Sequence, residues 1–185
     1  MSLQTFQETL ITAQSNGSTL TAAASASCLP AAAKFTLPAG FLRYIGQQIK
    51  IVASGKISCV VTTPGTARFD VRFGATSQIA DSLAMNLNTT AKTDSPWRLE
   101  FLMTLRAVGT SANFMYDGWW ASEAGVGASA VASGGNAFFC LPYGSAPAVG
   151  SNFDSTVSQV VDLYFTQTVA TGSMTLTQFS LISLN

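Results

Sequence analysis

Hydrophobic and polar residues alternate along most of this chain, and no apolar stripe repeats at the helical period of 3.6 residues. Alternation of this kind, interrupted by turns rich in Gly, Pro, Ser and Thr, predicts half-buried β-strands. The pattern is clearest in WRLEFLMTLRAV (97–108), where every second residue from Trp97 to Ala107 is apolar. Strands are predicted within residues 31–41, 49–61, 63–74, 83–91, 97–108, 113–124, 136–142, 157–170 and 174–184.

Short turns between neighbouring segments predict three β-hairpins. These join 49–61 to 63–74 through the turn TTPGT, 97–108 to 113–124, and 157–170 to 174–184. Gly55 interrupts the first segment, which is either one long strand or two strands joined by a kink. In the last segment the apolar phase slips between Leu176 and Phe179, which indicates a β-bulge.

Many short strands separated by regular turns are typical of an all-β fold. We therefore predict a single antiparallel β-sandwich that resembles a jelly roll, formed by residues 30–185. The pattern is weaker in residues 1–29, which are predicted to be an N-terminal arm or an edge strand. A chain of 185 residues is consistent with one such domain.

Charge is scarce in this chain and balances to zero. It has nine basic and nine acidic residues, or 10% charged residues, where about 25% is usual. A surface covered by uncharged residues favours association, so we expect a protein packed against its neighbours as a dimer or trimer. The sequence has no run of basic residues of the kind that binds nucleic acid, so nucleic acid is not expected as a partner. The apolar stretches are too short to span a membrane, and no export signal is visible, so synthesis and assembly in a host cytoplasm are expected.

The residue types argue against catalysis and against bound cofactors or metals. The chain has no histidine, which excludes Ser–His–Asp and Cys–His sites within one chain. Its three cysteines, Cys28, Cys59 and Cys140, lack metal-binding spacing and are predicted to be buried free thiols. Asp117 and Glu123, which flank two tryptophans, are the best remaining pair for a glycosidase. Because no second motif supports that chemistry, we interpret the tryptophans as packing residues and expect no enzyme.

A row of charges lies on one strand. In TPGTARFDVRFG (63–74), Arg68, Asp70 and Arg72 alternate with apolar residues and share one face. A second strand carries the charged residues Arg98, Glu100 and Arg106 in the same pattern. If the two strands are neighbours, opposite charges meet across the sheet and contribute about 0.2–1 kcal/mol per pair. The alternative is that the row forms salt bridges between subunits, where charges set specificity.

Several stretches together resemble a group of virion proteins from tailed bacteriophages. They are PAAAKFTLPAGF, IKIVASGKIS, VVTTPGT, DVRFG, AMNLNTTAKT, SEAGVG, APAVGSNFDSTVSQVVDL and LISLN, and they cover nearly the whole chain from about residue 30. The resemblance implies a jelly-roll-like sandwich present in many copies on a virion. Among such proteins, a capsid decoration (cement) protein is the leading hypothesis. It would bind the major capsid protein and neighbouring copies of itself, and stabilise the shell from outside.

The expected contact elements are the N-terminal arm and the loops 125–135 and 142–156. Trp119 and Trp120 are the best single anchors, because tryptophan is enriched at interface hot spots. An alternative function is a tail-associated or receptor-binding sandwich that recognises a host glycan or protein. Exposure of Tyr116, Trp119 and Trp120 along a groove would support that alternative, and their burial in the sandwich would count against it. A carbohydrate-binding module outside a virus is a third hypothesis.

Overall fold

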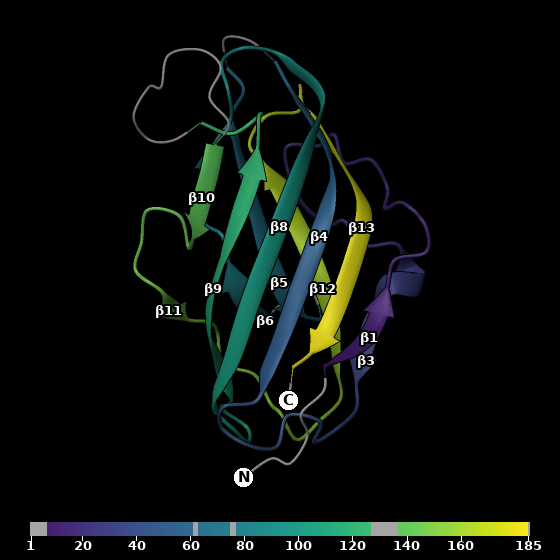
Figure 1. Ribbon diagram of the computed structural model, residues 1–185, viewed down its shortest axis with the longest axis vertical. Helices are drawn as coiled ribbons and strands as arrows, with labels where there is room; N and C mark the ends of the chain where they lie inside the picture. Colours follow the sequence, from purple (N-terminus) through teal and green to yellow (C-terminus); the bar gives the residue numbers. More distant parts are fainter. Residues whose placement is uncertain (1–6, 61–62, 75–76, 127–136, 185) are drawn as a thin grey trace.

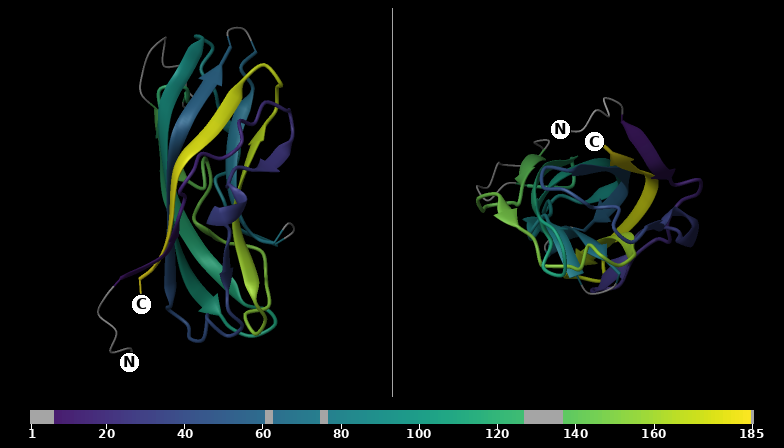
Figure 2. Two further views of the ribbon diagram at one scale, coloured as in Figure 1. Left: turned by 90° about the vertical axis from the view of Figure 1, so that its right-hand side faces the viewer. Right: turned by 90° about the horizontal axis from the view of Figure 1, so that it is seen from below.

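The fold is a sandwich of two antiparallel β-sheets. The structure is a computed structural model and describes residues 7–60, 63–74, 77–126 and 137–184. Two sheets face each other across an apolar core, with the seven-stranded sheet in front in Figure 1 and the six-stranded sheet behind it. Seen from below, the two sheets enclose this core (Figure 2). The all-β sandwich predicted from the alternating pattern is confirmed.

Each sheet is built from strands that are distant in the sequence. The front sheet has the order β1 (Glu8–Thr12), β13 (Ser173–Ser183), β4 (Gln48–Cys59), β8 (Lys92–Ala107), β9 (Asn113–Ser122) and β10 (Ala137–Leu141), and β11 (Ala148–Val149) also pairs with β9. The back sheet has the order β2 (Ser25–Ser27), β12 (Gln159–Gln167), β5 (Thr66–Phe73) and β6 (Ser77–Asp81), while β3 (Phe35–Leu37) pairs with β12 and β7 (Met85–Asn86) with β5. A short 3-10 helix, η1 (Ala31–Ala33), precedes β3.

The strand order is that of a jelly roll. The chain passes repeatedly from one sheet to the other. As a result, the four strands β1-β13-β4-β8 of the front sheet face the back sheet, in which β2 and β3 occupy the first position, β12 the second, β5 the third, and β6 and β7 the fourth. Strands β9, β10 and β11 come between β8 and β12 in the sequence and widen the front sheet beyond this arrangement. In the described part of residues 1–29, β1 forms the edge of the front sheet and β2 pairs with β12.

Two of the three predicted hairpins are wrong. Strands β4 and β5, on either side of the TTPGT turn, belong to opposite sheets, and so do β12 and β13. Only the hairpin of 97–108 with 113–124 is confirmed, as β8 and β9. The error has a simple cause: strands that face each other across a core and strands that pair in one sheet both alternate apolar and polar residues. The pattern fixes which face is buried but does not fix the pairing partner.

Strand β4 is one continuous strand, and Gly55 lies where it passes the predicted bulge. The register of β13 against β4 shifts between Leu176 and Gln178, which confirms the bulge. Gly55 pairs with Leu176 at this point, and a Cβ atom on Gly55 would lie 2.1 Å from the carbonyl oxygen of Thr175. The glycine therefore allows a close approach of the two backbones that no other residue would permit without a shift.

Aromatic rings join the two sheets at the centre of the core. The ring of Phe69, on β5 of the back sheet, lies 5.0 Å from that of Trp97 and 6.1 Å from that of Trp120, both on the front sheet. It also lies 5.1 Å from the ring of Phe165, its direct cross-strand partner on β12. All four side chains are buried. Phe69 is thus the residue through which both sheets share one packed cluster.

We expect Phe69→Ala to lower the free energy of unfolding by about 3–5 kcal/mol, because the cavity would open between the two sheets. Phe69→Leu, which keeps most of the apolar volume, should cost clearly less. Urea denaturation monitored by circular dichroism measures both values. A loss below about 1.5 kcal/mol for the alanine variant would show that the core repacks around the gap.

All three cysteines are free thiols, as predicted, but they differ in exposure. Cys28 and Cys59 are buried, and the Cys28 thiol donates a hydrogen bond to the carbonyl oxygen of Leu163 at 3.1 Å. Burial raises the pKa of both thiols above the usual value. Cys140 is exposed on β10, so the expectation that every cysteine is buried is wrong for this one.

In the native protein we expect a thiol reagent such as Ellman's reagent to modify only Cys140, because thiolate formation and access are both suppressed at the two buried sites. All three thiols should react after denaturation. The Cys140→Ser variant should show almost no native reaction. Fast modification of a second thiol in the native wild type would contradict this prediction.

Candidate binding surfaces

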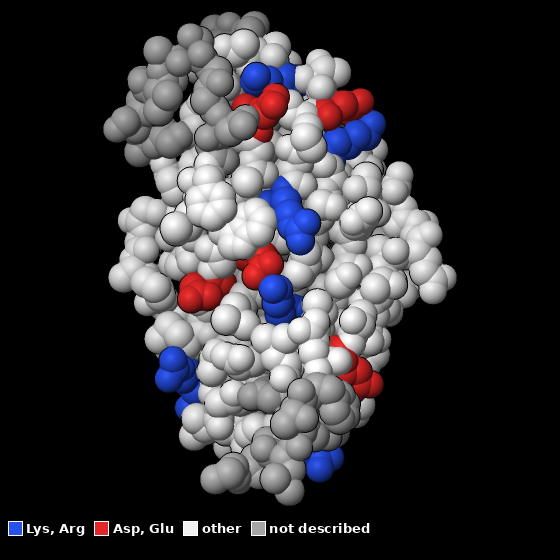
Figure 3. Space-filling view, viewed as in Figure 1, with Lys and Arg blue, Asp and Glu red and all other residues white. Residues whose placement is uncertain are grey.

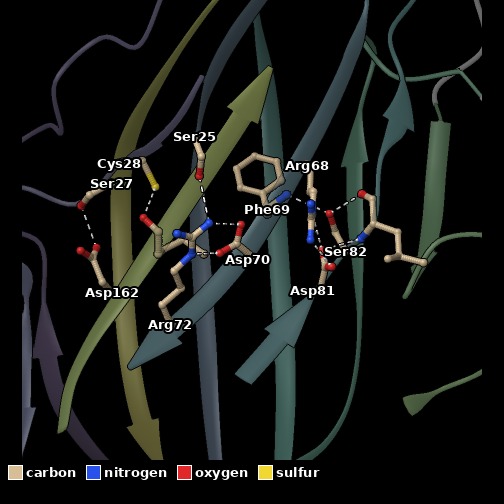
Figure 4. A network of polar contacts seen from close by, with 12 residues as sticks. Ser25, Ser27, Cys28, Arg68, Phe69, Asp70, Arg72, Asp81, Ser82 and Asp162 are labelled. Carbon is tan, nitrogen blue, oxygen red and sulfur yellow. Dashed lines mark hydrogen bonds and ion pairs between the residues drawn. The ribbon is translucent and has the colours of Figure 1, made fainter. Parts of the chain in front are cut away.

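The charged row on β5 is neutralised within the protein. Arg68 donates two hydrogen bonds to the carboxylate of Asp81 on β6, from Nε at 2.8 Å and from Nη2 at 2.6 Å. Arg72 makes the same bidentate contact, from Nε and Nη2, with the carboxylate of Asp70 on its own strand. These contacts raise the pKa of both guanidinium groups above the usual value. Figure 4 shows the two pairs side by side on the back sheet.

The network continues towards the N-terminal strands. Arg72 Nη2 donates to the hydroxyl of Ser25 at 2.9 Å, and its guanidinium lies 4.0 Å from the centre of the Tyr164 ring. On the same face, the carboxylate of Asp162 accepts a hydrogen bond from the hydroxyl of Ser27 and forms an ion pair with Lys34, each at 2.7 Å. These charges tie β2, β12 and β5 together, so the row forms part of the sheet itself.

The partners weighed from the sequence for this row are not its neighbours. Arg98, Glu100 and Arg106 lie on β8 of the front sheet, whereas β5 belongs to the back sheet. Glu100 instead pairs with Lys50 on β4, with 2.8 Å between Oε1 and Nζ. The physical reason is again the crossing between sheets, which separates two strands of similar charge pattern.

We expect Arg72→Met to lower the free energy of unfolding by about 3 kcal/mol, because it leaves the Asp70 carboxylate, 1% exposed, without its cation. The double variant Asp70→Leu/Arg72→Met should recover most of that loss, since no buried charge remains. Arg106→Met, at an exposed position on β8, is the matched control and should change stability by less than about 0.5 kcal/mol. Equal losses for the single and double variants in urea denaturation would contradict the proposed pairing.

The three aromatic residues predicted as contacts point in two directions. Trp120 is 0% exposed and stacks on Phe139 in the core, and Tyr116 is 6% exposed and packs edge-on against Phe101. Only Trp119 lies on the outer face of the front sheet, where it is half-buried. Neighbouring residues of a strand point to opposite faces, so Trp119 and Trp120 cannot both reach a partner.

Trp119 belongs to an exposed aromatic cluster, which we call the Trp119 platform and define as Trp119, Phe138 and Arg98. The ring of Phe138, on β10, stacks against that of Trp119 with 5.5 Å between centroids and 22° between planes. Phe138 is 63% exposed. The Arg98 guanidinium, on β8, lies 5.9 Å from the centroid of the Trp119 ring. Phe138 is not among the predicted contact residues, although the alternation in NAFFCLP places one of its two phenylalanines on the outer face.

An open groove of about 470 Å³ lies beside the platform. Arg98, Ala121 and Phe138 occupy one row across β8, β9 and β10, and the small side chain of Ala121 leaves a hollow between the two larger ones. The groove is lined by Pro96, Trp97, Arg98, Ala121, Ser122, Glu123 and Phe138. Figure 3 shows this face of the protein, where large uncharged areas separate a few charged side chains.

The glycosidase pair considered from the sequence has the wrong spacing. Asp117 lies within β9, and Glu123 comes one residue after that strand ends. Six residues of extended strand separate two groups by about 20 Å. The paired carboxylates of glycosidases lie about 5–9.5 Å apart. Asp117 and Glu123 therefore cannot act together on one glycosidic bond.

A second apolar surface lies at one end of the sandwich, at the bottom of Figure 1. It is formed by residues 38–47, 108–112 and 153–158, and we call it the loop end. Buried Ser155 joins these loops: its backbone N–H donates to the carbonyl of Gly109 at 2.9 Å, and its carbonyl accepts from Gly40 at 3.1 Å. Ile45, at the tip, is 65% exposed. The exposed large hydrophobic residues of the loop end are Tyr44, Ile45, Val108 and Val157.

The loops expected to make contacts are only partly described. Residues 127–136, most of the 125–135 loop, lie outside the described residues. The 142–156 loop includes the short strand β11 and then runs into the loop end, where Phe153 bridges to Ala112. In the described part of the chain no three potential metal ligands come together. The described residues also include no helix that is long and apolar enough to cross a membrane.

Comparisons with solved structures yield distant likenesses. No protein-family model matches the chain, and no curated protein matches it in sequence. The CBM2 module of the evolved Dit of Lactobacillus casei BL23 phage J-1 is 10% identical, with 82% of this chain and 69% of that chain covered and a TM-score of 0.31. A protein of unknown function from Shewanella oneidensis MR-1 is 8% identical, with 96% and 78% covered and a TM-score of 0.38. Likenesses this distant carry no argument about function.

Proposed function

We propose that the protein is a non-enzymatic structural protein of a tailed-phage virion, and that it decorates the capsid by binding the major capsid protein. The loop end is the observation that carries this proposal. Tyr44, Ile45, Val108 and Val157 expose apolar side chains on loops that Ser155 holds together. Apolar side chains on a fixed support are suited to a permanent contact, because little conformational entropy is lost on binding.

The distribution of charge supports the same proposal. The charges of the back-sheet strands are all in ion pairs, and the loop end contains two charged residues, Arg43 and Asp154. Cores of permanent interfaces are depleted in charge in the same way. Copies arranged as dimers or trimers on a symmetric lattice would bind through several such ends at once. Modest contacts then add up to firm attachment.

A tail-associated receptor-binding protein is the second candidate function. The Trp119 platform favours it, since an exposed aromatic pair beside a groove is suited to a ligand more than to a lattice. The location of the protein on the particle separates the two candidates.

The first test is antibody-gold labelling of intact particles viewed by electron microscopy. Gold spread over the head is the expected result for a decoration protein. Gold confined to the tail or its tip would contradict capsid decoration and favour the receptor-binding function.

We further expect Ile45→Asp to reduce binding to capsids at least about tenfold, because it places a charge in an apolar contact. Val149→Asp, which changes an exposed valine of β11 away from the loop end, is the matched control and should bind as the wild type does. Co-sedimentation of the purified variants with capsids that lack the protein measures both. Equal binding of Ile45→Asp and the wild type would exclude the loop end as the contact.

A further inference from the structure

The Trp119 platform has the geometry of a floor for a flat ligand. Its two rings come from adjacent strands, are 22° from parallel, and stand on the outer face of the sheet. Beneath them, on the inner face of the same two strands, Trp120 stacks on Phe139 with 5.4 Å between centroids and 25° between planes. The buried stack fixes the strands that carry the exposed one. The platform is therefore preorganised, which lowers the entropic cost of binding.

Two charged side chains at the platform, Arg98 and Asp117, form no ion pair with the residues that the structure describes. Lys50, Lys56 and Lys92 each lie within 4.0 Å of a carboxylate. Arg98, within the platform, instead contacts the ring of Trp119. Asp117 lies two residues before Trp119, on the same face of β9. Free guanidinium donors at one side and free carboxylate acceptors at the other suit a ligand rich in hydroxyl groups.

The size of the site favours a small ligand over a protein. A stable protein interface uses about 20–30 residues on each side. The apolar part of the platform is only two side chains wide and is bordered by Arg98, Glu100 and Asp117. Its groove of about 470 Å³ instead falls within the range of small-molecule sites.

We propose that the Trp119 platform and its groove bind carbohydrate. The C–H face of a pyranose ring would lie on Trp119 and Phe138, because polarised C–H groups are attracted to the negative faces of aromatic rings. Arg98 would donate to hydroxyl or carboxylate oxygens of the sugar, and Asp117 would accept from hydroxyl groups on the opposite side. The occupant is thus a glycan with at least one exposed pyranose ring. This inference uses no residue of the loop end and goes beyond the proposed capsid contact.

The intrinsic fluorescence of Trp119 can report ligand binding at this site. Of the protein's three tryptophans, Trp97 is 2% exposed and Trp120 is 0% exposed, so the half-buried Trp119 is the most accessible to solvent. A ligand on the platform should shift the fluorescence of Trp119 and protect it from quenching by acrylamide. The Trp119→Phe variant keeps an aromatic ring and should bind while losing the fluorescence response.

The experiment is binding of the full-length protein to an array of neutral and acidic glycans, followed by fluorescence titration with the best soluble oligosaccharide. Trp119→Ala and Phe138→Ala should each weaken binding about tenfold, the equivalent of one stacking contact. Ala121→Leu should also weaken it by filling the groove. Ile45→Asp is the matched control and should bind glycan as the wild type does, which keeps this test separate from that of the capsid contact.

The role of Arg98 is tested on the same array. If the guanidinium pairs with a carboxylate of the sugar, Arg98→Ala should weaken binding to acidic glycans more than binding to neutral glycans. If the guanidinium donates to hydroxyl groups, the variant should weaken binding to both kinds of glycan equally. Either result supports the site. Absence of binding to every glycan on the array would overturn the proposal. So would binding that Trp119→Ala and Phe138→Ala leave unchanged, with both variants shown to be folded by circular dichroism.

Discussion

The aromatic contact between the two sheets is the interaction on which the rest of this structure depends. The ring of Phe69, on the back sheet, lies 5.0 Å from that of Trp97 and 6.1 Å from that of Trp120, both on the front sheet, and 5.1 Å from that of its own neighbour Phe165. Each strand must give one face to this core, since its side chains alternate between two faces. Only the outer face of each sheet, and the loops at the ends, remain for contacts with other molecules.

The alternating pattern predicted most strands, the bulge in β13 and the one hairpin that pairs within a sheet, because those features are local. It could not predict that β4 and β5 separate into opposite sheets, since both arrangements bury the same residues. The same distinction between local features and long-range pairing applies to the candidate sites. The outward direction of Arg68, Asp70 and Arg72 was predictable, but the pairing of Arg68 with Asp81 depends on the register of β6.

The two outer faces use their charges differently. On the back sheet, Asp70 and Asp162 are almost fully buried, and their partners are fixed by bidentate or short contacts that connect three strands. Burying charges is costly unless they are paired, so these groups serve to hold β2, β5 and β12 in register. On the front sheet the charges are more exposed, and Arg98 and Asp117 are unpaired among the described residues. Among the described residues of the two outer faces, this second face therefore carries the charged groups that have no ion-pair partner.

The position of β9 and β10 explains how a binding surface can be both exposed and rigid. These strands widen the front sheet beyond the eight-stranded jelly-roll arrangement, yet they are anchored in its core through Trp120 and Phe139. The same pairing that brings Trp120 opposite Phe139 brings Trp119 diagonally opposite Phe138 on the outer face. Cross-strand neighbours at this diagonal are within reach of aromatic side chains. The buried stack of Trp120 on Phe139 stabilises the fold on the inner face of β9 and β10. Because both stacks depend on the same strand pairing, it also sets the geometry of the solvent-exposed stack of Trp119 and Phe138 on the outer face.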